Sequence, residues 1–310
     1  MRSENNDSWK ASLAAIFCHV FWGFSFMASR TALDTAHVFV LLSHRFVLSF
    51  LFLHLMPRQI AGMRREKNRI LPLLLLGLLQ PVLYFFGEQY GLLHSTTVFS
   101  GVMIAMIPAF STLAAAPILK ERPTWLQLLF SLISVGGVVG IGLMSRQSGR
   151  LELIGVLFLL LAVVSAAGYT LLARNLSKTA SSFSRTYAMT GAGAVVFTVL
   201  AAVVCKGSVS DYFAPFRTVS YTVSILFLSL VCSALCFFLS NYALSRLSVA
   251  RETVFSNLTT AVSVFAGTVF LHEPFTALGL LFCAMILVGI YGVQRASPER
   301  RERSKQRQRG

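Results

Sequence analysis

Residues 85–140 read FFGEQYGLLHSTTVFSGVMIAMIPAFSTLAAAPILKERPTWLQLLFSLISVGGVVG, and the same pattern returns 152 positions further along the chain. The shift needs no gap, and it superimposes identical residues at many points: Phe85 on Phe237, Tyr90 on Tyr242, Ala109 on Ala261, Glu121 on Glu273 and Gly137 on Gly289. A unit of about half the chain is therefore repeated, and this repeat decides how the fold is built.

The composition is typical of a membrane protein. Of the 310 residues, 55% are hydrophobic and 13% are charged, and the mean hydropathy is +0.69, whereas soluble domains carry about 25% charged residues. Apolar runs of about 20 residues recur from end to end, each long enough to cross about 30 Å of hydrocarbon as a helix. We therefore expect an all-α polytopic membrane protein, and we interpret the first run as a span and not as a signal peptide.

The apolar runs predict ten transmembrane helices, at about residues 11–30, 36–56, 70–92, 95–119, 124–144, 152–173, 186–205, 218–244, 249–271 and 275–294. Of the 27 Lys and Arg residues, 21 then face the side of the amino terminus, Arg185 among them, and five face the other side. Because cytoplasmic loops are enriched in Lys and Arg, this bias predicts two cytoplasmic termini in a plasma (inner) membrane. It also explains the net charge of +15 without a nucleic-acid partner.

Five spans in each copy of the repeat have a geometric consequence. An odd number of spans reverses the second copy, so the two halves are inverted about an axis in the membrane plane. We expect one repeat at residues 1–145, an inverted repeat at 146–294 and a basic cytoplasmic tail at 295–310. The first spans agree, because Trp22-Gly23-Phe24-Ser25 aligns with Ala167-Gly168-Tyr169-Thr170 at a shift of 145.

The chain contains the motifs FWGFSFMASR, LSHRF, GEQYGLLHSTTVFSGVMIAMIPAF and LKERPTWLQ, and the last has an echo in LHEPFTAL. With these motifs the chain resembles the drug/metabolite transporter superfamily, EamA type, over essentially its whole length. The resemblance implies ten helices around a central cavity, with the fifth and tenth helices at the periphery. It also implies export, or less often uptake, of small polar metabolites. One departure is that Pro108 in the fourth span has Thr260 as its counterpart, so a proline hinge applies to one half only.

Two charged residues lie within predicted spans, Arg45 in the second and Glu88 in the third. Ionisable groups in a membrane are costly and usually face a cavity or a partner. We interpret them as candidate substrate-binding residues that pair loosely when the site is empty, with Arg45 released to an anionic group of the cargo. The alternatives are a structural ion pair and an arginine that reaches outward to the membrane surface.

Aromatic and amide side chains supply the other candidate substrate-binding residues: Trp22, Tyr84, Gln89, Tyr169, Asn241, Tyr242 and Asn257. A binding cavity needs apolar walls and a few polar anchors, although ordinary packing is the alternative for each of them. We interpret the repeated glutamates Glu121 and Glu273 as helix caps, because each precedes a span. The repeated glycines, such as Gly137 and Gly289, allow close helix packing.

These observations favour a secondary transporter, in the exporting direction, of small polar metabolites or drugs such as amino acids. It would work by alternating access around a midplane cavity. The alternatives are a facilitator or channel and an intramembrane enzyme. The enzyme would need paired acids, a nucleophile with its base or a metal cluster, and the predicted spans do not offer such a group. We therefore expect no enzyme activity, no catalytic residue, no metal and no cofactor. The expected partners are the cargo, the lipid bilayer and coupling protons, and the expected assembly is a monomer or homodimer.

Overall fold

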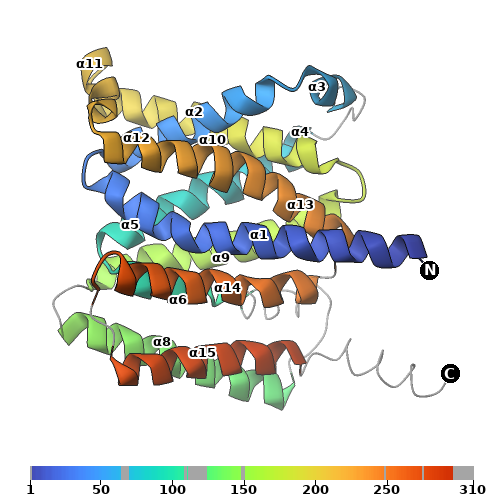
Figure 1. The fold of residues 1–310 in the computed structure, drawn as a ribbon, viewed down its shortest axis with the longest axis vertical. Helices are drawn as coiled ribbons and strands as arrows, with labels where there is room; N and C mark the ends of the chain where they lie inside the picture. The colour runs from blue at the N-terminus through green and yellow to red at the C-terminus, as the bar shows by residue number, and fades with distance from the viewer. Residues whose placement is uncertain are drawn as a thin grey trace.

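A computed structural model describes the backbone of residues 2–63, 70–107, 110, 124–147, 151–247, 249–273 and 276–295. Side chains are described within these ranges except at residues 2–8, 127, 144–147, 249–254, 256–257 and 293–295. All regular structure in this part of the chain is helical, which confirms the all-α class (Figure 1). Pro108, Glu121 and most of the basic tail lie outside the described residues.

The first half of the chain contains α1 (Arg2–Leu33), α2 (Val38–His54), α3 (Pro57–Met63), α4 (Ile70–Gly77), the π-helical segment η1 (Leu78–Leu83), α5 (Tyr84–Leu93), α6 (Thr97–Ile104) and α8 (Trp125–Gln147). The second half contains α9 (Leu153–Leu176), α10 (Ser182–Val204), α11 (Val209–Phe213), the 3₁₀ turn η2 (Ala214–Arg217), α12 (Val219–Leu226), the π-helical segment η3 (Phe227–Leu235), α13 (Cys236–Arg246), α14 (Val249–Val269) and α15 (Ala277–Arg295).

Five helical segments of the described chain are long and apolar enough to cross a membrane: Trp9–Leu33, Ile70–Leu93, Leu153–Leu176, Ser182–Val204 and Val219–Arg246. The pair α2 and α3, bent by 90° at a short break, gives a sixth. These correspond to the predicted spans one, three, six, seven, eight and two. The other four predicted spans coincide with shorter apolar helices or lie partly outside the described residues, so they remain predictions.

The two halves run in opposite directions. The Glu152 N–H, just before α9, donates to the His94 carbonyl oxygen just after α5 (3.0 Å), so α9 begins where α5 ends. Arg30, near the end of α1, donates to the carbonyl oxygen of Leu92 at the same place (2.9 Å). The first helix of one repeat therefore ends where the first helix of the other begins, as an inverted repeat requires.

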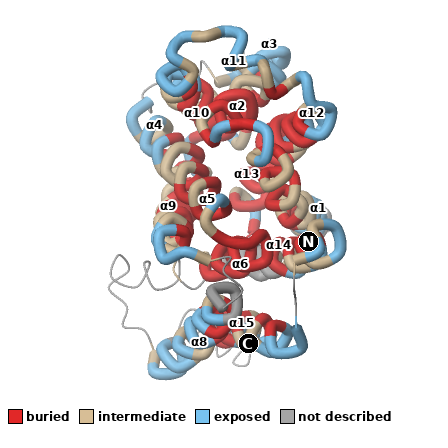
Figure 2. The backbone as a smooth tube through the Cα atoms, turned by 90° about the vertical axis from the view of Figure 1, so that its left-hand side faces the viewer, coloured by how far each residue is buried: buried red, intermediate tan, exposed pale blue. Residues whose placement is uncertain are grey.

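Equivalent helices also pair with one another. Helices α2 and α10 lie antiparallel, since Ser43 Oγ bonds Thr198 Oγ1 (2.8 Å) and His54 Nδ1 bonds Tyr187 Oη (2.9 Å). Helices α8 and α15 form a separate antiparallel pair at the edge of the bundle, where the resemblance placed the fifth and tenth helices (Figure 2). In Figure 2 the buried residues of the other helices lie mainly toward the middle of the main bundle.

The α8–α15 contact depends on glycine at matched positions. A Cβ on Gly137 would lie 2.7 Å from the Phe282 carbonyl oxygen, and one on Gly289 would lie 2.6 Å from that of Phe130. The shift of 152 residues converts one contact into the other. The predicted packing role of these glycines is confirmed.

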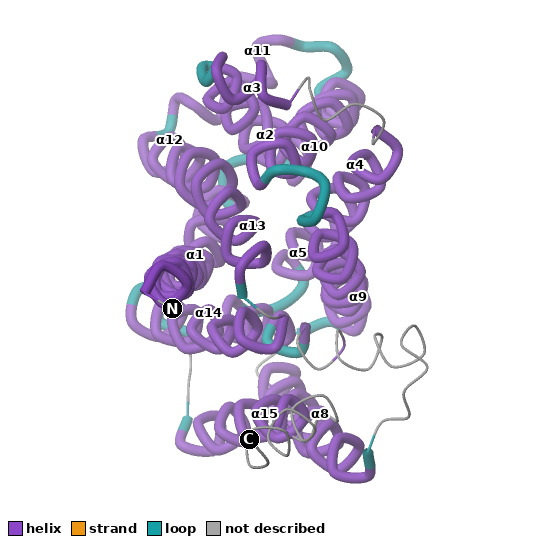
Figure 3. Tube along the Cα trace, turned by 90° about the vertical axis from the view of Figure 1, so that its right-hand side faces the viewer, coloured by secondary structure: helices purple, strands orange, loops and turns teal. Residues whose placement is uncertain are grey.

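The third span of each repeat is interrupted at the same place. The π-helical segment η1 maps onto residues 230–235, the last part of η3. In η1, Gln80 has a non-helical backbone (φ −146°, ψ 114°) and is followed by Pro81, which has no N–H to donate to the helix. π-Helical interruptions are frequent at functional sites. Figure 3 shows the two segments that follow them, α5 and α13, facing each other across the bundle.

Helix α10 begins at Ser182 and not near residue 186, because the Ser181 hydroxyl accepts the Ser184 N–H (3.1 Å) and caps an earlier first turn. Arg185, assigned above to a loop, therefore lies inside the helix and is fully buried. It donates to the carbonyl oxygens of Ala173 (3.0 Å) and Asn241 (2.8 Å). A buried arginine thus joins α10 to α9 and α13.

Candidate functional site

A cavity of about 90 Å³ lies within the bundle, between helices of both repeats. Its walls come from α1, α2, η1, α5 and α6 of the first repeat and from α9, α13 and α14 of the second. Some of the lining residues lie well inside their helices, as Ser25 does in α1 and Thr170 in α9. This is the position that the inverted repeat predicts for a binding site.

The cavity follows the symmetry of the repeat. Three pairs of equivalent residues line it: Phe85 and Phe237, Glu88 and Ser240, and Ser25 and Thr170. The two phenylalanine rings also contact each other, with centroids 6.1 Å apart. Equivalent residues of the two repeats therefore form the walls, but among the described lining residues the carboxylate comes from the first repeat only.

Arg45 is held in this cavity with spare hydrogen-bonding capacity. Its Nε donates to Ser233 Oγ (2.7 Å), and its guanidinium carbon lies 4.2 Å from the centre of the Phe85 ring. The side chain is 1% exposed, yet Nη1 has no hydrogen-bond partner. A buried cationic donor without an acceptor is costly, and an anion that enters the cavity would supply the missing acceptor.

Glu88 lines the same cavity and is held by its own helix. The Tyr84 hydroxyl donates to Oε1 (2.8 Å), and Gln89 Nε2 donates to Oε2 (2.8 Å). No ion pair joins Glu88 to Arg45 among the contacts of the described chain. The two opposite charges therefore face one cavity without a direct salt bridge, although they interact electrostatically, and the loose pairing that we had expected stays a prediction.

Trp22 and Tyr169 also line the cavity. Trp22 Nε1 donates to the Cys232 carbonyl oxygen (2.9 Å), and the Tyr169 hydroxyl donates to Asn241 Oδ1 (3.3 Å). Each aromatic side chain thus has its polar end bonded and offers its ring as an apolar wall. With Tyr84, Arg45 and Glu88, five of the nine candidate residues come together.

The other four candidates lie elsewhere or are not described. Gln89 is fully buried behind Glu88, and Asn241 lies behind Tyr169, where its Nδ2 donates to Thr186 Oγ1 (3.1 Å). Tyr242 does not line the cavity; its ring packs under the guanidinium of Arg246, 3.9 Å from the ring centre to the guanidinium carbon. The side chain of Asn257 lies outside the described residues.

The cavity also contains residues that we did not propose from the sequence. His19 Nδ1 bonds Thr259 Oγ1 (3.0 Å), which joins α1 to α14 at the cavity wall. Gln80 lines the cavity at the break in η1. Phe237 and Ser240 also line the cavity, and the repeat could have identified them, because they are the counterparts of Phe85 and Glu88.

The chemistry of the cavity suits a small molecule with an anionic group. It offers one cation, one carboxylate, several hydroxyl groups and aromatic walls, which is the mixture found in small-molecule sites. Within the described residues, no group of three or more His, Cys, Asp or Glu side chains is placed to hold a metal ion.

Comparison with known proteins identifies the repeat. The model of the EamA-like transporter family matches residues 9–143 and again residues 153–295. The chain is 35% identical over 290 residues to the "Uncharacterized transporter YcxC" of Bacillus subtilis (strain 168), covering 91% of this chain and 92% of that protein. It is 29% identical over 293 residues to the "Probable terminal-alkyne amino-acid exporter" of Streptantibioticus cattleyicolor, covering 94% and 96% respectively.

A solved crystal structure has the same fold. It covers 95% of this chain and 98% of its own chain, with a TM-score of 0.67 and 15% sequence identity. At this identity the likeness concerns the fold alone.

Proposed function

The chain belongs to the EamA-like transporter family, and from this premise we propose that it exports small amino acids or closely related zwitterions by alternating access. Membership makes it a multi-pass membrane transporter of the drug/metabolite type. The cargo, the direction and the mechanism are the proposal.

The observation that carries the proposal is that Arg45 and Glu88 line one cavity without a direct salt bridge between them. Arg45 has a free donor at Nη1, and the described side chains that donate hydrogen bonds to the Glu88 carboxylate, Tyr84 and Gln89, are both neutral. An amino acid carries a carboxylate for the first and an ammonium group for the second. The aromatic rings of Trp22, Phe85 and Phe237 then suit an apolar side chain on the cargo. The name of the relative described as an amino-acid exporter supports the same class.

Protons are the coupling ion that we propose, with Glu88 as the carrier, since it is the carboxylate that faces the cavity. The two repeats, residues 1–145 and 146–294, would rock about the cavity between them. We place the protein in the plasma membrane with both termini in the cytoplasm, from the distribution of Lys and Arg. A monomer contains the whole cavity, although a homodimer is compatible with it.

Reconstitution in proteoliposomes tests this function. Vesicles are loaded with a mixture of labelled amino acids, and the release of each is followed with and without an imposed pH gradient. We expect saturable release of a subset with apolar side chains, accelerated by the gradient and lost with Arg45→Ala. Release that ignores every ion gradient would make the protein a facilitator, and no release of any amino acid would overturn the proposed cargo.

A further inference from the structure

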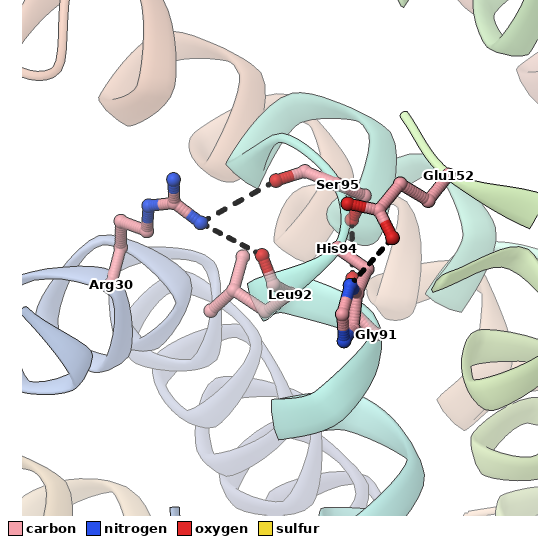
Figure 4. Close-up of polar contacts among 6 residues, drawn as sticks. All are labelled: Arg30, Gly91, Leu92, His94, Ser95 and Glu152. Carbon is pink, nitrogen blue, oxygen red and sulfur yellow. Dashed lines mark hydrogen bonds and ion pairs between the residues drawn. The ribbon is translucent and has the colours of Figure 1, made fainter. Parts of the chain in front are cut away.

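Two arginines make the same contact in the two repeats. Arg30, in the last turn of α1, donates from Nη1 to the carbonyl oxygens of Leu92 (2.9 Å) and Ser95 (3.5 Å) at the end of α5 (Figure 4). Arg174, in the last turn of α9, donates from Nη1 to the carbonyl oxygens of Leu244 and of Leu247 (2.9 Å), at and just after the end of α13. Each arginine therefore joins the first span of its own repeat to the third span of the same repeat.

The acceptors are strictly equivalent. The shift of 152 residues places Leu92 on Leu244 and Ser95 on Leu247. The donors are 144 residues apart, one fewer than the shift of 145 that aligns the first helices, so a sequence alignment does not place one arginine on the other. The same contact is therefore made by an arginine that lies one residue before the aligned position.

The two contacts lie at opposite ends of the bundle. Helices α1 and α5 end where α9 begins, as the bond from the Glu152 N–H to the His94 carbonyl oxygen shows. Helix α9 runs from that end to the other, so Arg174 and the end of α13 lie at the opposite end. We call the two ends the Arg30 face and the Arg174 face.

Each contact also lies just beyond the cavity. Glu88 lines the cavity four residues before Leu92, which is about 6 Å along a helix. Thr170 lines it four residues before Arg174, and Leu244 is itself a lining residue. Arg30 thus joins the cavity-lining helices α1 and α5 on one side of the cavity, and Arg174 joins α9 and α13 on the other.

The chemistry of the contact is suited to opening and closing. The last carbonyl oxygens of a helix have no partner within the helix, and they carry the negative end of its dipole. Water can replace the guanidinium there when the helices separate, so that neither side is left without hydrogen bonds. Apolar packing has no such replacement, because separation would expose its surface to water.

We propose that Arg30 and Arg174 are the two gating residues of this transporter. The Arg30 contact closes the cavity toward the Arg30 face, and the Arg174 contact closes it toward the other. Both are made in this structure, and the cycle breaks one at a time. This inference rests on the proposed alternating access, but it does not depend on the identity of the cargo.

Accessibility of a cavity cysteine tests the proposal without any cargo. Ser240→Cys is introduced after replacement of the five native cysteines, and it is labelled with an impermeant thiol reagent in intact cells and in inside-out vesicles. We expect Arg30→Ala to raise labelling from the Arg30 face by roughly threefold to tenfold and to lower it from the other face, as removal of one or two hydrogen bonds would. Arg174→Ala should do the reverse.

Matched controls exist on each face. Arg217 and Arg246 are exposed arginines at the Arg30 face and the Arg174 face respectively, and neither bonds the end of a neighbouring helix. Arg217→Ala and Arg246→Ala should leave labelling from both sides unchanged. Arg30→Lys and Arg174→Lys keep the charge with one ammonium group, so they should shift the labelling in the same directions but by less. They replace an alanine variant that does not reach the membrane.

The direction of the change decides the outcome. Unchanged labelling in both arginine variants, or a change toward the same face in both, would overturn the gating proposal. If the parent protein is labelled from one face only, it rests open toward that face, and the arginine of the closed face decides. The gating proposal then stands if the alanine variant of that arginine adds labelling from the closed face, and it falls if it does not.

Discussion

The guanidinium carbon of Arg45 lies 4.2 Å from the centre of the Phe85 ring, while no arginine among the described residues stacks on Phe237, the counterpart of Phe85. The two charged residues that line the cavity, Arg45 and Glu88, both belong to the first repeat. The second repeat contributes hydroxyl groups and aromatic or aliphatic wall. A polar cargo would therefore be oriented with its charged end toward the first repeat, whichever face it came from.

Arg45→Lys tests the guanidinium itself. Lysine keeps the charge but loses the planar fork and the stacking on Phe85, so we expect transport to slow by about tenfold or more. The measurement is flux in proteoliposomes at equal protein content. Ser233→Ala is the control, because it removes only the acceptor at Nε and should leave most of the flux. Normal flux in a well-expressed Arg45→Lys protein would show that Arg45 does not bind cargo.

Glu88→Gln tests proton coupling. Glutamine fits the same hydrogen bonds but cannot carry a proton, so we expect cargo exchange to continue while acceleration by a pH gradient disappears. Exchange and gradient-driven release are measured on the same vesicles. Tyr84→Phe removes one hydrogen bond to the carboxylate but keeps the acid, and it should keep the response. A full response to the gradient in Glu88→Gln would exclude Glu88 as the proton carrier.

The repeat made most of the fold predictable, because each buried contact of one half implies one in the other. It predicted the inversion and a packing role for the repeated glycines, while the resemblance to the transporter family predicted the peripheral position of α8 and α15. The sequence did not predict the contacts of Arg30 and Arg174, because the shift that aligns the two sets of acceptors does not align the two arginines. The shift of 152 residues relates the acceptors, Leu92 to Leu244 and Ser95 to Leu247, but nothing in the sequence indicates which side chain reaches their carbonyl oxygens.

The site was predictable in part, and its errors have physical causes. Arg45, Glu88 and three aromatic residues were found because charge and aromatic polarity are unusual in an apolar span. Tyr242 does not line the cavity with them, since neighbours on a helix point about 100° apart and its neighbour Asn241 is the one that bonds Tyr169. Arg185 was missed because the cap at Ser181 was overlooked, so the helix was started too late.

Gly137→Ala tests the close approach of α8 and α15. The new Cβ would lie 2.7 Å from a backbone oxygen of Phe282, so the helices must separate, at a cost of about 1–3 kcal/mol. Gly136→Ala is the matched control, because its Cβ would meet only the end of Met285 at 3.8 Å. Thermal unfolding in detergent should show a lower Tm for Gly137→Ala and an unchanged Tm for Gly136→Ala. Equal Tm values would mean that the pair adjusts without cost.

Glu273→Gln tests an unexpected cap. We had expected Glu273 to cap the helix that follows it, but its carboxylate accepts the N–H groups of Thr97 (2.7 Å) and Val98 (2.9 Å) at the start of α6. Loss of the charge should lower the free energy of unfolding by about 1 kcal/mol. Glu152→Gln, at a side chain that is 66% exposed, should have little effect on the same thermal measurement. An equal loss in both variants would mean that the cap contributes nothing specific.

His94 and Arg246 test the inversion directly, because the shift of 152 residues relates them and they end equivalent helices. Helices α5 and α13 run in opposite directions, so these two residues lie on opposite faces of the bundle. The distribution of Lys and Arg places His94 outside the cell and Arg246 in the cytoplasm. His94→Cys in a background without native cysteines should react with an impermeant thiol reagent in intact cells. Arg246→Cys should react only in inside-out vesicles. Reaction of both cysteines from the same side would contradict the inverted arrangement. If each cysteine reacts from the side opposite to the expected one, the orientation in the membrane is reversed but the inversion stands.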